Sequence, residues 1–395
     1  MSETTLAKRL FMRPLSGRLL QGLRPRLPAM TGTLRRLVLA ESPSLEKRSA
    51  DRCCRLLAGE WRRRGARVEI LREKQRGDHL RVTWQPARGG KPRGQLLVLG
   101  HYDTVYASGT LRTMPFRVRG GKAYGPGTFD MKGGIVQALY ALEALQKAQA
   151  ELRKRIVFLW TSDEEIGSES SRKMIEQEAR KSDAVLVLEP SFGPQGLLKT
   201  ARKGVGEAEL IVHGRASHAG LAPQEGVNAV HELARQIARL EQWNDLRRGI
   251  TVNADIVEGG TRVNVIAERA RAVLDLRALT IADMRKVERR LHALRPELPG
   301  ARIEVRGGFN RAPLERTVSA GLYAQARKLA REMGLELGEC TAGGGSDGNL
   351  TGALGVPTLD GLGAVGDGAH SGNEHVVLRR MPERAALLAA LLATA

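Results

Sequence analysis

The feature that most constrains this chain is a strand-like segment that ends in carboxylates. Residues 155–161 form an apolar, β-branched and aromatic run, which predicts a buried strand. Asp163, Glu164 and Glu165 follow it, and Gly167 comes shortly after them. Neighbouring carboxylates repel one another unless cations lie close by. A solvated acidic turn is the simplest interpretation of this triplet alone, so other regions of the chain must supply partners before it indicates a functional site.

The composition favours a globular protein of two domains that acts on small molecules. A chain of 395 residues is long for a single core, and 42% hydrophobic residues are sufficient to build two. The formal net charge is +20, but only 4% of the residues are aromatic, and we find no zinc finger, RNP motif or basic heptad helix. We therefore expect no nucleic-acid partner. Attraction of anionic substrates fits the charge better, and a genome-wide preference for arginine over lysine is the alternative.

The cysteines and the N-terminal segment predict a cytoplasmic protein. Cys53, Cys54 and Cys340 provide no disulfide framework and no Cys-x-x-Cys pair, which argues against thiolate metal sites. Residues 1–29 form a basic extension without an apolar segment long enough for a secretory signal or a membrane span. We interpret this extension as an amphipathic helix on the body of the protein. Its basic residues are Lys8, Arg9, Arg13, Arg18, Arg24 and Arg26.

Further apolar strands end in the same way as the first. Residues 96–99 and 184–188 are separated by helical stretches, and a glycine-rich turn is predicted at 89–94. This alternation is typical of an open α/β sheet, whose sites lie beyond the carboxyl ends of the strands. A glycine-rich loop at 124–134 and a loop near the C-terminus contribute further polar residues. The polar groups gathered in this way are His101, Asp103, Asp130, Glu164, Glu165, Glu189 and His370.

The middle of the chain has a different pattern. Between about 203 and 313, alternating strand-like runs and two helical runs follow a βαββαβ order, which predicts an inserted α+β domain of ferredoxin-like type with an antiparallel sheet. The strands outside it predict an α/β catalytic domain with a mostly parallel mixed sheet between helices. We expect a basic extension at 1–29, a catalytic domain made of the two segments 30–202 and 314–395, and the insert between them at 203–313.

The residue types indicate a metal site. Imidazoles and carboxylates without thiolates suit zinc or another divalent first-row metal in a catalytic setting. Two metals that share a bridging aspartate would neutralise the carboxylates and polarise water for hydrolysis. Glu164 and Glu165 are expected on opposite sides of an extended backbone, so that one binds metal and the other accepts a proton. Asp103 is placed to hold the second ring nitrogen of His101.

Four segments carry a family resemblance. Residues 100–105, 125–134, 162–167 and 188–191 closely resemble the di-zinc amidohydrolases. That family includes glutamate carboxypeptidase (carboxypeptidase G), acetylornithine deacetylase, succinyl-diaminopimelate desuccinylase and aminoacylase. The spacing of the ligand residues fits the carboxypeptidase G branch, and the likeness runs from about residue 30 to the C-terminus.

The resemblance implies two zinc ions per subunit, with cobalt or manganese as substitutes. Glu164 would be the general base that takes a proton from the bridging water and passes it to the leaving amine. Asp103 would orient His101, and the peptide bond after Asp130 is commonly cis in this family. The implied ligands are His101, Asp130 and Glu189 for one zinc and Asp130, Glu165 and His370 for the other.

The insert carries motifs of the same family. Residues 215–220 resemble its Ser-His-Ala-Gly motif, in which His218 would stabilise the oxyanion in the active site of a partner subunit. The resemblance implies that the insert is a dimerisation or lid domain, through which two subunits form a homodimer. Asn264 and Arg277 match positions that hold the terminal carboxylate of the substrate, and arginine suits that task. A solvated strand face is the alternative for Arg277.

Two weaker substrate-binding matches follow. Residues 343–349, which include Gly344, match a loop that lines the substrate pocket. A phosphate cradle is the rival interpretation, but no Gly-Lys-Ser/Thr ending is present. Arg311 lies where the family often has Arg-Pro-Pro, a pattern from which this chain departs.

Taken together, these patterns predict a metal-dependent exopeptidase. The expected substrate is a small anionic peptide or N-acyl amino acid, from which a C-terminal residue, preferably glutamate-like, is removed. A deacylase of N-acyl amino acids or a dipeptidase on the same scaffold is the alternative. A ligand-binding relative without activity is disfavoured, because the ligands and the base are all present.

Overall fold

We describe the protein from a computed structural model that covers residues 14–85 and 92–394. Lys8, Arg9 and Arg13, and the first residues of the turn predicted at 89–94, lie outside the described residues. The chain divides into two compact units. Unit 1 comprises residues up to Thr200, Arg316–Thr341 and Ser346–Ala395, and unit 2 comprises Ala201–Glu315 and Ala342–Gly345.

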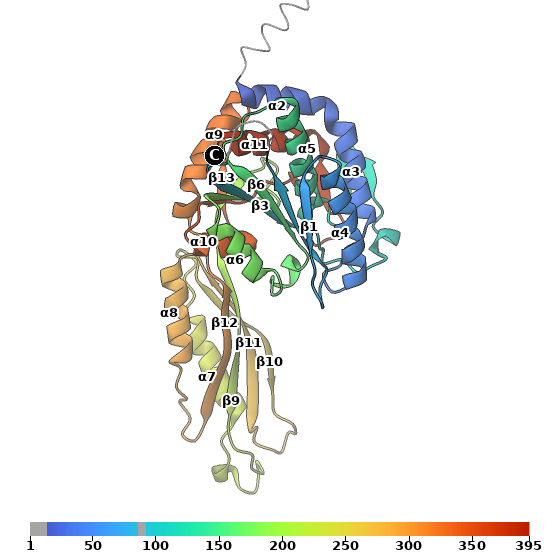
Figure 1. The fold of residues 1–395 in the computed structure, drawn as a ribbon. Coiled ribbons are helices and arrows are strands. Elements are labelled where there is room, and N and C mark those ends of the chain that lie inside the picture. The colour runs from blue at the N-terminus through green and yellow to red at the C-terminus, as the bar shows by residue number, and fades with distance from the viewer. Residues whose placement is uncertain (1–13, 86–91, 395) are drawn as a thin grey trace, which may run out of the picture. The chain divides into compact units, whose positions relative to one another are not determined.

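Unit 1 is built on a six-stranded mixed sheet with the order β1-β2-β6-β3-β7-β14 (Figure 1). Strand β3 pairs in parallel with β6 and β7, and β14 pairs in parallel with β7. Strand β2 runs antiparallel to its neighbours β1 and β6. The predicted mostly parallel mixed sheet is therefore confirmed. The strands are β1 (Arg67–Leu71), β2 (His79–Trp84), β3 (Gln95–His101), β6 (Arg155–Thr161), β7 (Ala184–Val187) and β14 (Thr358–Leu359).

Helices cover both faces of this sheet. Leu96 and Val98 of β3 belong to one hydrophobic cluster, whereas Leu97 and Leu99 pack with Ile175 in another. Successive strand residues point to opposite faces, so a sheet covered on both sides requires a continuously apolar strand. One face carries α2 (Leu15–Leu23), α3 (Leu27–Leu39), α4 (Lys47–Arg62), α5 (Gly133–Lys147), α9 (Arg316–Glu332) and α11 (Met381–Thr394), and the other carries α6 (Arg172–Arg180) and α10 (Asp347–Ala353).

The N-terminal helix α2 is amphipathic, as expected. Leu19, Leu20 and Leu23 are buried in the main core, while Arg18 is exposed. A short 3-10 turn, η1 (Arg24–Arg26), joins α2 to α3. Among the described residues, no helix combines the length and the apolar character needed to cross a bilayer.

Two smaller sheets contain further strands. Strands β15-β16-β5-β4 form a four-stranded sheet, and β8 pairs with β13. These strands are β4 (Arg117–Arg119), β5 (Lys122–Tyr124), β8 (Leu198–Arg202), β13 (Glu339–Ala342), β15 (Gly366–Asp367) and β16 (His375–Val377).

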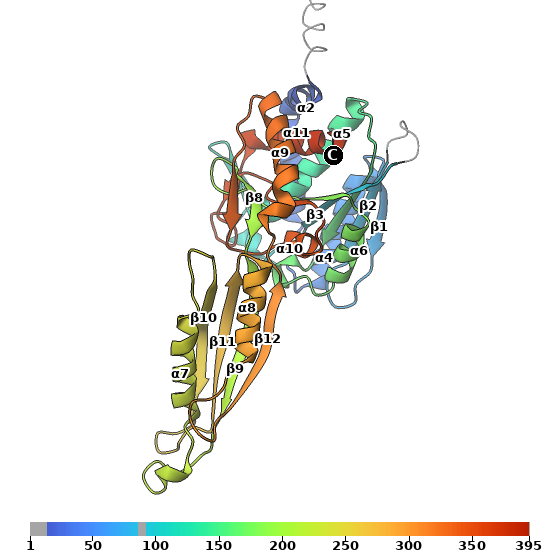
Figure 2. The same cartoon turned by 90° about the vertical axis from the view of Figure 1, so that its left-hand side faces the viewer.

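Unit 2 is a βαββαβ unit, as predicted for the insert. Its antiparallel sheet has the order β10-β11-β9-β12, and α7 and α8 pack on one face of it (Figure 2). The side chains of Asn228 and Thr280 cap the N-termini of the two helices. Unit 2 has its own hydrophobic core. Its elements are β9 (Gly204–His213), α7 (Ala229–Glu241), β10 (Thr251–Gly259), β11 (Arg269–Ala278), α8 (Ile281–His292) and β12 (Arg302–Arg311).

Candidate metal centre

The parallel strands of unit 1 deliver polar side chains to one edge of the sheet. His101 is the last residue of β3, Glu164 and Glu165 follow β6 in the turn η4 (Glu164–Ile166), and Glu189 follows β7. Because β6, β3 and β7 are parallel neighbours, their carboxyl ends meet at the same edge. Asp130 comes from the loop η3 (Thr128–Lys132) that precedes α5. His370 lies in the loop before β16, with a left-handed backbone φ of 61°.

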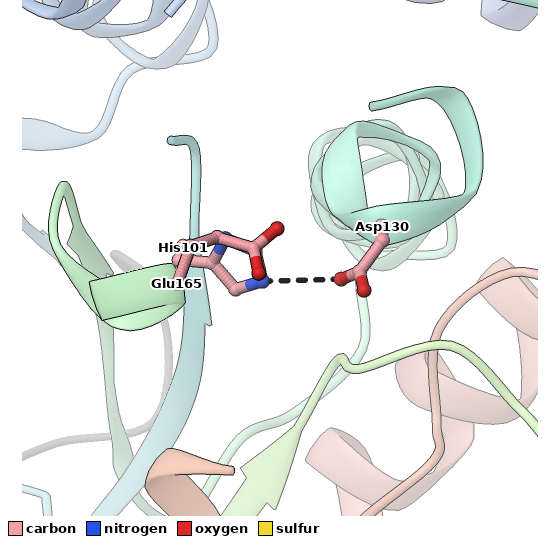
Figure 3. A group of neighbouring side chains, drawn as sticks. All are labelled: His101, Asp130 and Glu165. Atoms are coloured by element: carbon pink, nitrogen blue, oxygen red, sulfur yellow. Dashed lines mark hydrogen bonds and ion pairs between the residues drawn. The ribbon is translucent and has the colours of Figure 1, made fainter. Parts of the chain in front are cut away.

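Asp130 lies between two imidazoles. Its Oδ1 is 3.2 Å from Nε2 of His101, and its Oδ2 is 3.5 Å from Nε2 of His370. Figure 3 shows the contact with His101 and the side chain of Glu165 beside it. Each imidazole also faces a carboxylate of its own. Nε2 of His101 is 3.4 Å from Glu189 Oε1, and Nε2 of His370 is 3.0 Å from Glu165 Oε2.

The donor atoms lie close enough together to hold cations. Those of His101, Asp130 and Glu165 are all within 4.8 Å of one another, and the same is true of His101, Glu164 and Glu189. Imidazole nitrogen and carboxylate oxygen are the usual donors of catalytic zinc sites. The donor set therefore fits a divalent metal. The second group includes Glu164, the residue predicted as base, so proximity alone does not separate ligand from base.

The carboxylates control the protonation of the imidazoles. Burial lowers the pKa of His101, but Asp103, Asp130 and Glu189 outweigh it and raise the pKa well above its usual value. Asp130 and Glu165 raise the pKa of His370 to about 10. Burial raises the pKa of Glu165 to about 7 against the influence of His370. Burial also opposes ionisation of Asp130, but the two imidazoles hold its pKa well below the usual range. The cluster thus stabilises positive charge between its carboxylates.

Asp103 connects the first imidazole to the acidic turn. Nδ1 of His101 lies 3.1 Å from the carbonyl oxygen of Asp103 and 3.4 Å from its Oδ1. The Asp103 carboxylate also accepts hydrogen bonds from the backbone N–H groups of Glu164 and Glu165, at 3.4 and 3.3 Å. The hydroxyl of Ser44 donates to Asp103 Oδ2 at 2.7 Å. One buried carboxylate therefore holds both the ring of His101 and the turn η4.

The acidic turn differs from the expectation in its backbone. Glu164 and Glu165 were predicted on an extended segment, but η4 is a turn of 3-10 helix. The prediction was wrong because the strand already ends at Thr161, before the carboxylates. A 3-10 turn rotates successive side chains by about 120°, which still separates the two groups. Glu165 faces His370, and Glu164 lies in the group with Glu189.

Asp163, which had no predicted role, stabilises the chain beyond the turn. Its Oδ2 accepts hydrogen bonds from the backbone N–H and hydroxyl of Ser170, both at 2.7 Å, and from the N–H of Ser171 at 3.2 Å. These contacts organise the loop just before α6. Asp163, the remaining member of the acidic triplet, therefore has a structural role.

Sequence reasoning missed Glu374, a fully buried residue. Its carboxylate accepts hydrogen bonds from the backbone N–H groups of Gly127, Phe129 and Asp130, at 2.9, 2.7 and 2.9 Å. Glu374 thereby holds the loop that presents Asp130. The Asp130–Met131 peptide bond in this loop is cis, as the resemblance implied. Glu374 lies four residues after His370, but its contacts are with a loop about 245 residues earlier, which no local pattern reveals.

In unit 2, two of the predicted residues share a loop region. His218 is exposed, and its Nδ1 accepts hydrogen bonds from the N–H groups of Gly220 and Leu221, at 3.2 and 3.1 Å. The backbone of this segment pairs with that of the segment around Asn264, because Ala219 N–H donates to the Asn264 carbonyl at 2.9 Å. Asn264 is exposed as well.

The other predicted substrate-binding residues also lie in unit 2. Arg277 on β11 is half-buried, and Asp275 binds its Nε and Nη2 at 2.9 and 2.6 Å. Arg311 at the end of β12 is buried. Gly344 is exposed, and its carbonyl accepts a hydrogen bond from Arg202 at 3.0 Å.

An α/β sheet that gathers imidazoles and carboxylates at its carboxyl edge is the arrangement of a metal-dependent hydrolase. The model of peptidase family M20/M25/M40 matches residues 97–394. Carboxypeptidase G2 of Pseudomonas sp. (strain RS-16) is 32% identical over 379 residues, which cover 92% of this chain and 89% of that protein. This chain therefore belongs to peptidase family M20/M25/M40, and the resemblance seen in its motifs is confirmed.

Other relatives extend the comparison. Acetylornithine deacetylase of Myxococcus xanthus is 30% identical over 221 residues, which cover 53% of this chain and 56% of that protein. The aminopeptidase PepT of Bacillus cereus has a similar structure, with a TM-score of 0.78, 21% identity, and coverage of 94% of this chain and 98% of that one. A metallo-carboxypeptidase of Sulfolobus solfataricus has a TM-score of 0.70 at 18% identity, with coverage of 92% and 98%. The two structural likenesses support the fold alone.

Proposed function

We propose that this hydrolase is a di-zinc carboxypeptidase that removes a C-terminal amino acid, preferably glutamate-like, from a peptide or an N-acyl amino acid. The observation that carries the proposal is the position of Asp130, whose two oxygens face different imidazoles. Each imidazole has a further carboxylate, so the cluster divides into two half-sites that share Asp130. We assign His101 and Glu189 to one zinc and His370 and Glu165 to the other.

The side chains around this cluster have defined tasks in the proposed reaction. Zinc held here would supply a polarised water and positive charge beside the scissile carbonyl. Glu164 accepts the proton of the attacking water and returns it to the leaving amine. Asp103 holds Nδ1 of His101 and so directs Nε2 toward the ligand set.

The loops of unit 2 supply substrate recognition in this proposal. Because Nδ1 of neutral His218 accepts two backbone hydrogen bonds, its proton resides on Nε2, which suits donation to an oxyanion. Arg277 is oriented by Asp275 through Nε and Nη2, so Nη1 is left to bind a substrate carboxylate. Asn264, Arg311 and Gly344 complete the proposed substrate-binding set.

We place His218 in the active site of a partner subunit, so the proposed enzyme is a homodimer formed through unit 2. Strand β10 supports this arrangement, because it is an edge strand with exposed Ile256 and Val257. Mixing His218→Ala subunits with Glu164→Ala subunits should restore activity above that of either variant alone. Mixtures without any gain in activity would contradict action across the dimer.

The first test separates the base from the ligands. Glu164→Ala should lower kcat by at least about a hundredfold and leave two zinc ions per subunit, because the base does not hold metal in this proposal. The matched variant Glu165→Ala should lose zinc as well as activity. Zinc content is measured by mass spectrometry after removal of excess metal. A Glu164→Ala protein that loses zinc and retains turnover would reverse the two assignments.

The second test concerns the substrate. N-acyl-glutamates should give higher kcat/KM values than N-acetylornithine or simple dipeptides, because the net charge of +20 and Arg277 favour an anionic C-terminal residue. An N-acyl-amino-acid deacylase is the second candidate, supported by the likeness to acetylornithine deacetylase. Higher kcat/KM for N-acetylornithine would establish that alternative.

A further inference from the structure

Helix α2 leaves a pocket against the C-terminal half of α5 in unit 1. The pocket has a volume of about 210 Å³. Leu19, Gly22 and Leu23 of α2 line one side, and Tyr140 and Ala144 of α5 line the other. Figure 1 shows α2 above α5 on the helical side of the unit. Ala144 lies 11 residues after Gly133, the first residue of α5, and therefore about 16 Å along the helix from the end that adjoins the Asp130 loop.

Gly22 of α2 is one of the residues that line this pocket. A Cβ atom built on Gly22 would meet no other atom within 4 Å, so a side chain there would enter open space. Leu19 and Leu23 flank this glycine and are 3% and 1% exposed, so the parts of their side chains that reach the pocket border a packed core. A partly enclosed apolar wall of this kind binds apolar groups.

Cationic side chains surround the apolar wall. Arg18, Arg26 and Lys147 line the pocket, against the single carboxylate of Glu143. That carboxylate is already bound by Arg26 at 3.0 Å and by Arg64 at 2.8 Å.

The cations have donors to spare. Arg18 and Lys147 make no ion pair with any residue that the structure describes. The guanidinium of Arg26 also lies over the Tyr140 ring, 5.5 Å from its centroid. The pocket therefore combines an apolar wall with an excess of positive charge.

We propose that this pocket is a second binding site, which takes a small amphipathic carboxylate of the medium-chain fatty acid type. The carboxylate binds at Arg18, Arg26 and Lys147, and the tail lies along Leu19 and Leu23 beside Gly22. A polyphosphorylated ligand fits less well, because most of the lining is apolar and Glu143 would repel it. The inference is independent of the proposed hydrolytic chemistry.

The test measures binding of sodium octanoate to the full-length, zinc-loaded protein by isothermal titration calorimetry. Gly22→Leu places a side chain in the pocket and should weaken binding by at least about tenfold. Gly32→Leu is the matched control, because Gly32 lies in helix α3, meets no atom within 4 Å of its built Cβ, and does not line the pocket. Both changes replace a helical glycine, so their effects on helix stability are similar. Equal weakening by the two variants, or none by Gly22→Leu, would overturn the proposal.

A second comparison tests the role of charge. The double variant Arg18→Gln/Lys147→Gln should weaken octanoate binding severalfold and leave binding of the neutral analogue octanol unchanged. Octanol that binds as tightly as octanoate to the unaltered protein would show an apolar cavity without anion recognition. That result, or the absence of octanoate binding at millimolar concentration, would contradict the proposed ligand class.

Discussion

The candidate metal centre depends on a buried carboxylate outside the proposed ligand set. Glu374 accepts three backbone N–H groups from the loop that carries Asp130. Glu374→Gln retains the shape but replaces one acceptor oxygen by an NH₂ group, which faces N–H donors unfavourably. We expect zinc affinity to fall by about 10- to 100-fold, as is typical when a residue that positions a ligand is changed. Competition with a chelator measures that affinity.

A surface carboxylate provides the control for this variant. Among the described residues, the only ion pair of Glu176 on α6 is with Arg180, at 3.3 Å. Glu176→Gln should therefore leave zinc affinity unchanged. Thermal melting of the metal-free proteins separates loss of folding from loss of the site. A Glu374→Gln protein with unaltered zinc affinity would show that the loop holds its position without this carboxylate.

The cysteines should differ in reactivity. Cys53 and Cys54 are 1% exposed, and burial raises the pKa of Cys54 to about 12, so its thiolate is scarce at pH 8. Cys340 is only partly buried. We expect an aromatic disulfide reagent at pH 8 to modify Cys340 in the folded protein and the other two thiols only after denaturation. Rapid reaction of a Cys340→Ser variant would contradict this expectation.

Among the elements, the strands of the catalytic sheet were the most predictable. Strands β3, β6 and β7 each contain a continuous apolar run of at least four residues because helices cover both faces, and that leaves a clear pattern in the sequence. Polar residues directly after such strands stand out, and parallel pairing brings them together. His101, Glu165 and Glu189 could therefore be grouped before the structure was known. Asp130 and His370, which lie on loops, were gathered with them as polar residues of loops near the strand ends, and their roles as ligands came from the family resemblance.

Long-range contacts and helix ends were not predictable. Ser44 and Glu374 contact the site across 59 and about 245 residues, so their neighbours in sequence carry no sign of their role. Helix α5 ends at Lys147, and Gln149 has a left-handed φ of 48°. The alanine- and leucine-rich pattern continues past this end, because the residues after it still pack against the core. The spacing of apolar residues therefore predicts which residues are buried more reliably than it predicts where a helix ends.

The exposed edge strand of unit 2 gives a prediction about assembly. If β10 forms the proposed dimer interface, Val257→Lys places a charge in it and should lower the dimer population by at least about tenfold. Val118→Lys on the edge strand β4 of unit 1 is the control, since the two valines are 55% and 54% exposed. Sedimentation velocity over a range of concentrations measures the effect. Equal dissociation by both variants would argue against an interface at β10.

At the scale of the whole molecule, the two units have separate cores, and the candidate metal centre belongs to only one of them. The hydrophobic clusters of unit 1 contain no residue of unit 2, and the core of unit 2 lies entirely within its own elements. All the assigned metal ligands belong to unit 1. Units with separate cores unfold as separate transitions when few interactions couple them.

Metal removal should therefore act on one unit only. A divalent metal that binds only the folded site, zinc in the proposed enzyme, stabilises unit 1 by about 4 kcal/mol when its free concentration is a thousand times the dissociation constant. For a unit of about 270 residues, that raises the midpoint by roughly 7 °C. Scanning calorimetry should show two transitions, of which chelation lowers one and leaves the other in place. His370→Ala should lower the same transition by less than chelation does, because it removes a ligand from only one of the two proposed half-sites. A chelator that shifts both transitions equally would show that the units unfold together.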